Sequence, residues 1–74
     1  PNPMAERAVL QYSGSARPTT VRWHDVMGRT VREAPLEQYG PSLVLERQGL
    51  PAGLYVVEVL AHGRSLGSVR VVCE

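Results

Sequence analysis

The fold of this 74-residue chain is decided by one stretch, Leu50-Pro51-Ala52-Gly53-Leu54-Tyr55-Val56-Val57-Glu58-Val59. Its first residues are typical of a loop, and Gly53 is expected to end that loop so that a strand can begin. Tyr55, Val57 and Val59 then share one face and Glu58 lies on the other, because successive side chains of a strand point to opposite faces. The stretch therefore predicts a strand with one buried side. The Tyr55 ring is expected to pack in the core while its hydroxyl finds a partner.

The same alternation recurs along the chain. Further apolar residues that share a face are Leu10 with Tyr12, Val21 with Trp23, Leu43 with Leu45, and Val69 with Val71. Because Trp23 is in phase with Val21, its ring is expected in the core. Helical periodicity is hard to find, since the segment 30–39 is interrupted by Pro35 and has no apolar stripe at helical spacing.

Turn residues separate these segments. Loops are predicted at 13–18, 38–41 and 48–53, and tight hairpin connections at 25–29 and 62–65. Gly28 and Gly63 are expected to take the positive φ that a side chain makes costly. About six short strands at close spacing predict an all-β fold, a small antiparallel sandwich.

Composition excludes several classes of protein. Eight Arg, no Lys and seven acidic residues give a net charge of +1, so neither nucleic acid nor anionic lipid is expected as a partner. The longest apolar stretch, Leu54 to Val57, is far shorter than the ~20 residues of a spanning helix. One cysteine forms no internal disulfide and no zinc site that needs two or more thiolates. A chain of this size that begins at Pro1 is expected to be a single domain, residues 1–74, cut from a longer polypeptide.

No group of residues predicts catalysis or metal binding. His24 and Asp25 are neighbours whose side chains face opposite ways on a strand, and His62 completes no ligand or nucleophile–base spacing. Asp25 is expected instead to accept backbone N–H groups in the turn 26–28. Cys73, in phase with Val69 and Val71, is either a small apolar core residue or a frayed terminal thiol. We therefore expect no enzyme, no cofactor and no small-molecule ligand.

Several motifs, taken in order, resemble a known family. Pro1-Asn2-Pro3 precedes an alternating strand. Val21 to Val31 (VRWHDVMGRTV) resembles a signature of alternating strand, Asp, two apolar residues, Gly-Arg and Val. Leu50 to Val57 (LPAGLYVV) resembles a Leu-Pro-Ala-Gly-hydrophobic-Tyr signature, and a short strand, 69–72, ends the chain. Together they are similar to the C-terminal sorting domain of the bacterial type IX secretion system, over almost the whole chain.

This resemblance implies an immunoglobulin-like β-sandwich of about six to seven strands at the end of a larger exported protein. The domain is expected to be a non-catalytic signal that directs the upstream cargo domain across the outer membrane to the cell surface. Its expected partners are the secretion machinery and a sortase-like transpeptidase, which removes the domain and links the cargo to surface lipopolysaccharide. Its expected location is the periplasm in transit, then the cell surface or the extracellular space.

The resemblance and the free end of the chain indicate candidate recognition residues: Asp25, Gly28, Arg29, Gly53, Tyr55, Val69, Arg70, Val71 and Val72. Most of them also have a plain structural explanation, since Gly28 suits a hairpin turn and Gly53 suits a loop before a strand. Arg29 is either a recognition group that offers its planar fork to a carboxylate or a solvated charge. If the terminal strand lies at a sheet edge, its backbone groups can pair with a partner strand.

Two other functions stay open at this point. Trp23, with Tyr12, Tyr39 and Tyr55, can in principle form a sugar-stacking platform, which would make the chain a carbohydrate-binding module of a secreted hydrolase. Tyr39, beside Gly40 in a predicted loop, is the aromatic side chain expected to be exposed. The other alternative is a structural or adhesive accessory module.

Overall fold

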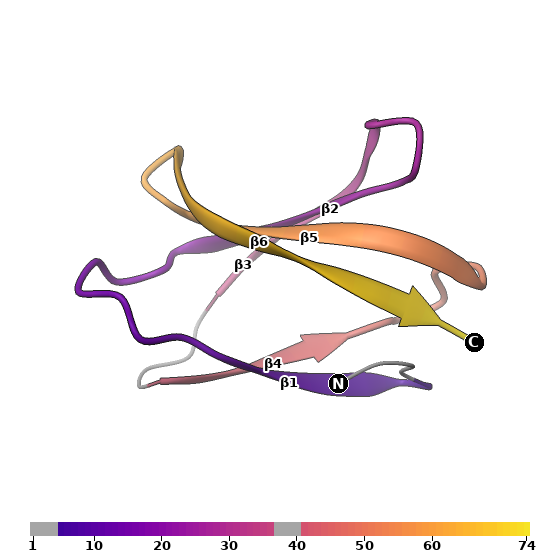
Figure 1. Ribbon diagram of the computed structural model, residues 1–74, viewed down its shortest axis with the longest axis horizontal. Coiled ribbons are helices and arrows are strands. Elements are labelled where there is room, and N and C mark those ends of the chain that lie inside the picture. Colours follow the sequence, from indigo (N-terminus) through magenta and orange to yellow (C-terminus); the bar gives the residue numbers. More distant parts are fainter. Residues whose placement is uncertain (1–4, 37–40) are drawn as a thin grey trace.

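Six strands arranged in two sheets form the protein, as seen in a computed structural model that describes residues 5–36 and 41–74. The strands are β1 (Arg7–Gln11), β2 (Thr20–His24), β3 (Thr30–Pro35), β4 (Ser42–Glu46), β5 (Gly53–Ala61) and β6 (Arg64–Cys73). One sheet has four strands in the order β3-β2-β5-β6, and the other pairs β1 with β4. Figure 1 shows the two sheets as separate layers, with β1 and β4 beneath the other four strands.

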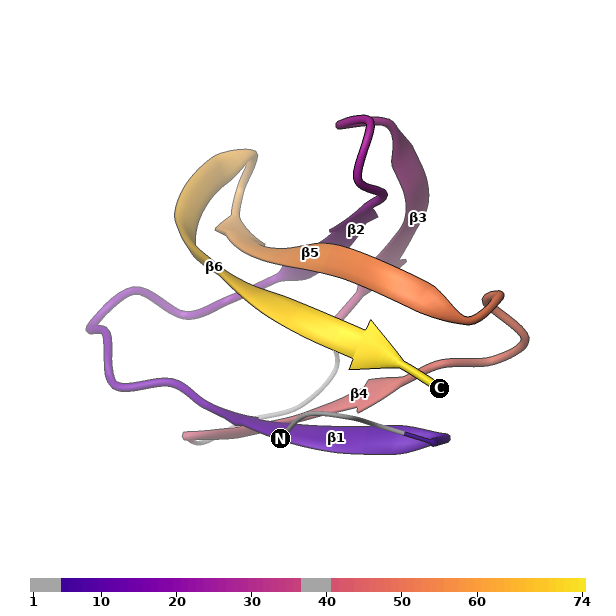
Figure 2. The ribbon, with the colours of Figure 1, turned by 45° about the vertical axis from the view of Figure 1, so that its right-hand side comes forward.

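All neighbouring strands are antiparallel. The hairpins β2–β3 and β5–β6 lie side by side because β2 pairs with β5, and the turned view in Figure 2 shows how strongly this sheet twists. The predicted all-β, immunoglobulin-like sandwich is confirmed. The segments 13–18 and 48–52 lie outside the strands, as predicted, and Gly53 begins β5. Most of the predicted loop 38–41, together with Tyr39 and the motif Pro1-Asn2-Pro3, lies outside the described residues.

The core lies between the two sheets and is built from the alternating apolar positions. Its largest fully buried side chains are Trp23, Leu43 and Val57. The Trp23 and Tyr55 rings meet edge to face, with their centroids 5.9 Å apart and their planes at 75°. The Tyr55 hydroxyl donates a hydrogen bond of 2.6 Å to the carbonyl oxygen of Pro51. Both predictions, a core Trp23 and a buried Tyr55 ring with a partnered hydroxyl, are confirmed.

β3 is a strand that the sequence did not reveal. It lies at one edge of the four-stranded sheet, where Arg32 pairs with Trp23 and Ala34 with Val21. The side chains of β3 that face the other sheet are thus those of Arg32 and Ala34, so this strand lacks the alternation of large apolar residues that the other strands show. Positive φ angles at Gly28 (83°) and Gly63 (81°) confirm the two predicted hairpin turns.

Candidate recognition surface

The turn between β2 and β3 is closed by hydrogen bonds that converge on Asp25. The backbone N–H of Asp25 donates to the carbonyl oxygen of Arg29 at 2.9 Å, and that of Gly28 donates back to the carbonyl of Asp25 at 3.0 Å. The carboxylate atom Oδ1 accepts the N–H groups of Met27, at 2.9 Å, and of Arg29, at 3.0 Å. The prediction that Asp25 accepts backbone N–H groups in this turn is confirmed.

The side chain of Arg29 also belongs to the turn. Its Nε and Nη2 atoms lie 2.9 and 2.8 Å from Oδ2 of Asp25, in an ion pair that neutralises both groups. Desolvation raises the pKa of the Asp25 carboxyl, but the hydrogen bonds from Arg29 and Met27 outweigh it, so the pKa lies below its usual value. Arg29 is therefore not a merely solvated charge, although most of its side chain remains exposed. Its role in recognition stays a prediction.

A polar network covers the outward face of the four-stranded sheet. Arg22 donates to Glu33 at 2.8 Å and lies 3.7 Å from Glu58. His24 is half-buried: its Nε2 lies 3.1 Å from Oε1 of Glu58 and its Nδ1 3.2 Å from the Thr30 hydroxyl. Hydrogen bonds to the side chain of His24, and then to that of Ser65, lower the pKa of Glu58. These groups come from β2, β3 and β5 and the start of β6.

Beside this network the outward face becomes apolar. Leu54 on β5 and Val72 on β6 are paired across the two strands, and both are exposed. A shallow hollow separates these strands from the β2–β3 turn. The hollow is lined by His24, Asp25, Val26, Gly28, Leu54, Val56 and Arg70. The structure thus brings Arg70 beside Asp25 and Gly28, from which it is far apart in the sequence.

The terminal strand β6 lies at the other edge of the four-stranded sheet. Val69 pairs with Val57, and Val71 pairs with Tyr55. Both valine side chains face the core, so they do not belong to the outward face of the sheet. Arg70 and Val72 alternate with them, and both are exposed.

Cys73, at the end of β6, has 2% of its surface exposed. Burial raises the pKa of its thiol. Of the two alternatives for this residue, the structure supports the small apolar core residue.

Two arginines that sequence analysis did not single out hold the sandwich together. Arg32 reaches across the open side between the sheets and donates to the carbonyl oxygens of Glu46, Arg47 and Gln48. Arg47 donates to the carbonyl of Leu50 at 2.8 Å, to that of Ala5 at 3.1 Å, and to that of Glu74. No local sequence signal marks either residue, because all the partners of Arg32, and Ala5 and Glu74 among those of Arg47, become neighbours only when the chain folds.

The described aromatic residues, Tyr12, Trp23 and Tyr55, do not form a platform for sugar stacking. Trp23 has 1% of its surface exposed and Tyr55 is buried against it, while Tyr12 is half-buried at the end of β1. Within residues 5–36 and 41–74, no group of three or more His, Cys, Asp or Glu side chains is placed to hold a metal ion. The same ranges contain no helix of the length and hydrophobicity that crossing a membrane requires.

The chain matches a known protein family. The model of the family described as secretion system C-terminal sorting domain matches residues 1–73. No curated protein matches, and no solved structure does. The match includes both sheets, the β2–β3 turn and the terminal strand. The chain therefore belongs to the family of secretion system C-terminal sorting domains, which are the sorting signals of type IX secretion.

Proposed function

We propose that residues 1–74 act as a single non-catalytic domain whose folded surface is the sorting signal of a larger exported protein. Membership of the family makes the chain a C-terminal signal for type IX secretion, with export across the outer membrane to the cell surface or extracellular space. The cargo lies upstream in the same polypeptide, and the domain passes through the periplasm before it meets the outer-membrane machinery. A sortase-like transpeptidase then removes the domain and attaches the cargo to the surface.

One observation carries the proposal of a folded signal: the family match extends from residue 1 to residue 73 and so includes both sheets. A short linear peptide at the chain end would not require the β1–β4 pair or the Asp25–Arg29 turn. The outward residues of the four-stranded sheet come from four strands, so they share a surface only in the folded chain.

Among the candidate residues, those on this outward surface are the ones we propose for direct recognition: Asp25, Gly28, Arg29, Arg70 and Val72. Gly53, Tyr55, Val69 and Val71 act indirectly, because they begin β5 or fill the core beneath the surface. β6 contributes in a second way. It is an edge strand, and an edge strand presents backbone groups that a partner strand can join.

Export of a reporter tests the proposal. Residues 1–74 are fused behind a reporter that carries a signal peptide, in a host with a functional type IX system. We expect the reporter on the cell surface, whereas the same fusion should stay in the periplasm of a host that lacks the system. Periplasmic retention in the competent host would contradict the proposed function.

Surface variants refine that test. Deletion of residues 68–74 would remove Val71 and Cys73 from the core, so lost export of that fusion would reflect unfolding. Arg70→Glu with Val72→Ser changes the outward side of β6 and leaves its core side intact. We expect reduced export for this pair, and unchanged export for Val9→Ser, which changes an exposed valine on the other sheet. If the Arg70→Glu, Val72→Ser variant were exported as well as the Val9→Ser variant, the outward face of β6 would be excluded from recognition.

A further inference from the structure

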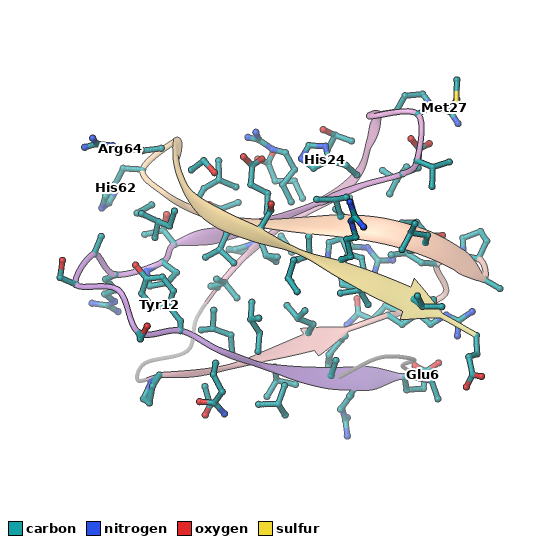
Figure 3. The ribbon with its side chains drawn as sticks, in the orientation of Figure 1. Glu6, Tyr12, His24, Met27, His62 and Arg64 are labelled. Atoms are coloured by element: carbon teal, nitrogen blue, oxygen red, sulfur yellow. The ribbon has the colours of Figure 1, made fainter. Side chains whose placement is uncertain are left out.

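Two large apolar side chains are mostly exposed to solvent at one end of the molecule. Val26 and Met27, which we call the turn tip, are 72% and 77% exposed, well above the other exposed large apolar residues of the part that the structure describes. Figure 3 shows Met27 at the far end of the β2–β3 turn, where its side chain points away from both sheets. Packing within the domain does not explain them.

The turn that carries them is held in one conformation. Asp25 accepts the N–H of Met27 itself, and Arg29 closes the turn from its other end. Gly28 has a φ of +83° and an added Cβ would meet nothing within 4 Å, so glycine is needed here for the backbone and not for space. A side chain presented on a braced turn loses little conformational freedom when it binds, and such preorganisation favours affinity.

The turn tip continues into the hollow on the outward face. Val26 lines that hollow together with Leu54 and Val56, which belong to β5. The surface thus has a projecting apolar side chain, Met27, beside a concave apolar region. Clustered apolar residues of this kind, rimmed by polar groups, are typical of protein–protein binding sites.

We propose that the turn tip and hollow form the principal contact between this domain and a protein of the secretion machinery. Met27 enters an apolar pocket on that protein, and an apolar side chain of the partner occupies the hollow beside Val26. The inference rests on the proposed sorting function and adds to it the residues, Val26 and Met27, and the chemistry of the partner site. Flexible, unbranched methionine suits such a pocket because it adapts to irregular apolar shapes.

Charge favours a protein over a lipid surface as the occupant. Arg29 is neutralised by Asp25, and the lining of the hollow contains Arg70 and Asp25, one cationic and one anionic side chain, so it holds no cluster of basic residues. Binding to a membrane surface requires clustered basic residues or a large apolar face, and two side chains on a charge-balanced surface provide neither. An apolar pocket with a nearly neutral rim is the complementary partner.

The test compares polar and apolar replacements at the turn tip in the reporter fusion. Met27→Gln keeps the length of the side chain but removes its apolar character. Val26→Ser removes the two methyl groups at the hollow and leaves a smaller, polar side chain. We expect surface reporter to fall about tenfold or more for the double variant, as at a central interface residue. Met27→Leu should restore export. Val9→Gln, at a valine 46% exposed on the opposite sheet, is the matched control and should export normally.

Folding and lipid binding are measured on the same variants. The thermal midpoint of the chain should stay within about 2 °C of the unsubstituted value, because exposed positions affect stability little. If the double variant loses stability, the single change Met27→Gln decides the outcome. Normal export of a folded Met27→Gln variant would overturn the proposal, while the unsubstituted fusion still reports on the sorting function independently. Co-sedimentation with phosphatidylglycerol vesicles that is lost on Met27→Gln would assign the turn tip to lipid and overturn it as well.

Discussion

Arg47 and Glu74 are joined by a hydrogen bond from the guanidinium Nη1 to the last carbonyl oxygen of the chain. The same nitrogen donates to the carbonyl of Ala5 at 3.1 Å, just before β1 begins. One side chain in the loop after β4 therefore holds the start of β1 beside the end of β6. In Figure 1 the carboxyl terminus accordingly lies close to the beginning of β1. The position of the end of β6 therefore depends on the other sheet.

Replacement of Arg47 by methionine should loosen this junction. Arg47→Met removes donors to three carbonyl oxygens but keeps the aliphatic part of the side chain. We expect a loss of about 1–3 kcal/mol in the free energy of unfolding, the usual cost of hydrogen bonds to a charged group. Urea denaturation measures that loss. Amide hydrogen exchange in the Arg47→Met variant should be accelerated more at Val72 and Cys73 than in β2.

Arg64→Met is the matched control, since Arg64 is exposed at the β5–β6 turn (Figure 3). It should change stability by no more than about 0.5 kcal/mol. Equal effects of the two changes would show that Arg47 does not hold the chain ends.

The Tyr55 hydroxyl should stabilise the loop before β5. Tyr55→Phe keeps the ring packed against Trp23 and removes only the 2.6 Å hydrogen bond to the carbonyl of Pro51. We expect a loss of about 1 kcal/mol, which in a domain of this size lowers the thermal midpoint by about 4–8 °C. Circular dichroism on heating checks this. A phenylalanine variant as stable as the tyrosine form would mean that water replaces the hydroxyl at Pro51.

The alternation of side chains was enough to predict most of the sandwich. Trp23 is buried because it is in phase with Val21, so strand periodicity alone places it. For Cys73 the phase with Val71 left two alternatives, a core residue and a frayed thiol, and only the structure decides between them. Asp25 and Gly28 were also predictable, since their roles are local to one turn. Such features depend only on residues a few positions apart, so the sequence alone is enough to predict them.

What the sequence did not reveal depends on contacts between distant segments. Arg32 lies on the core side of β3, where its guanidinium group donates to the carbonyl oxygens of Glu46 and Gln48 at the end of β4 and just after it. These groups come close to Arg32 only when the two sheets pack. The same holds for His24 and Glu58, which are partners because β2 pairs with β5. Val26 and Met27 lie in the turn that the sequence predicts, but hydropathy alone does not reveal that this turn points both side chains into solvent.

Gly28 should be required for its backbone conformation. An added Cβ meets nothing within 4 Å, so the cost of Gly28→Ala comes from the φ of +83° alone. That strain is about 1–2 kcal/mol, a large share of the stability of a small domain. Gly28→Asn should cost less, because asparagine tolerates the left-handed region. Unfolding free energies of the two variants make the comparison, and alanine at least as stable as asparagine would contradict it.

Stability should depend on pH through Glu58. Because hydrogen bonds from His24 and Ser65 lower its pKa in the folded chain, its carboxylate binds protons less readily folded than unfolded. Its contribution is therefore fully present above the ordinary glutamate pKa of about 4.3 and is lost as the pH falls through the folded value. Glu58→Gln removes that contribution. The thermal midpoints of the two proteins should differ most near pH 6 and converge towards about pH 2. A difference that stays constant over this range would show that Glu58 is stabilised equally in the folded and unfolded chains.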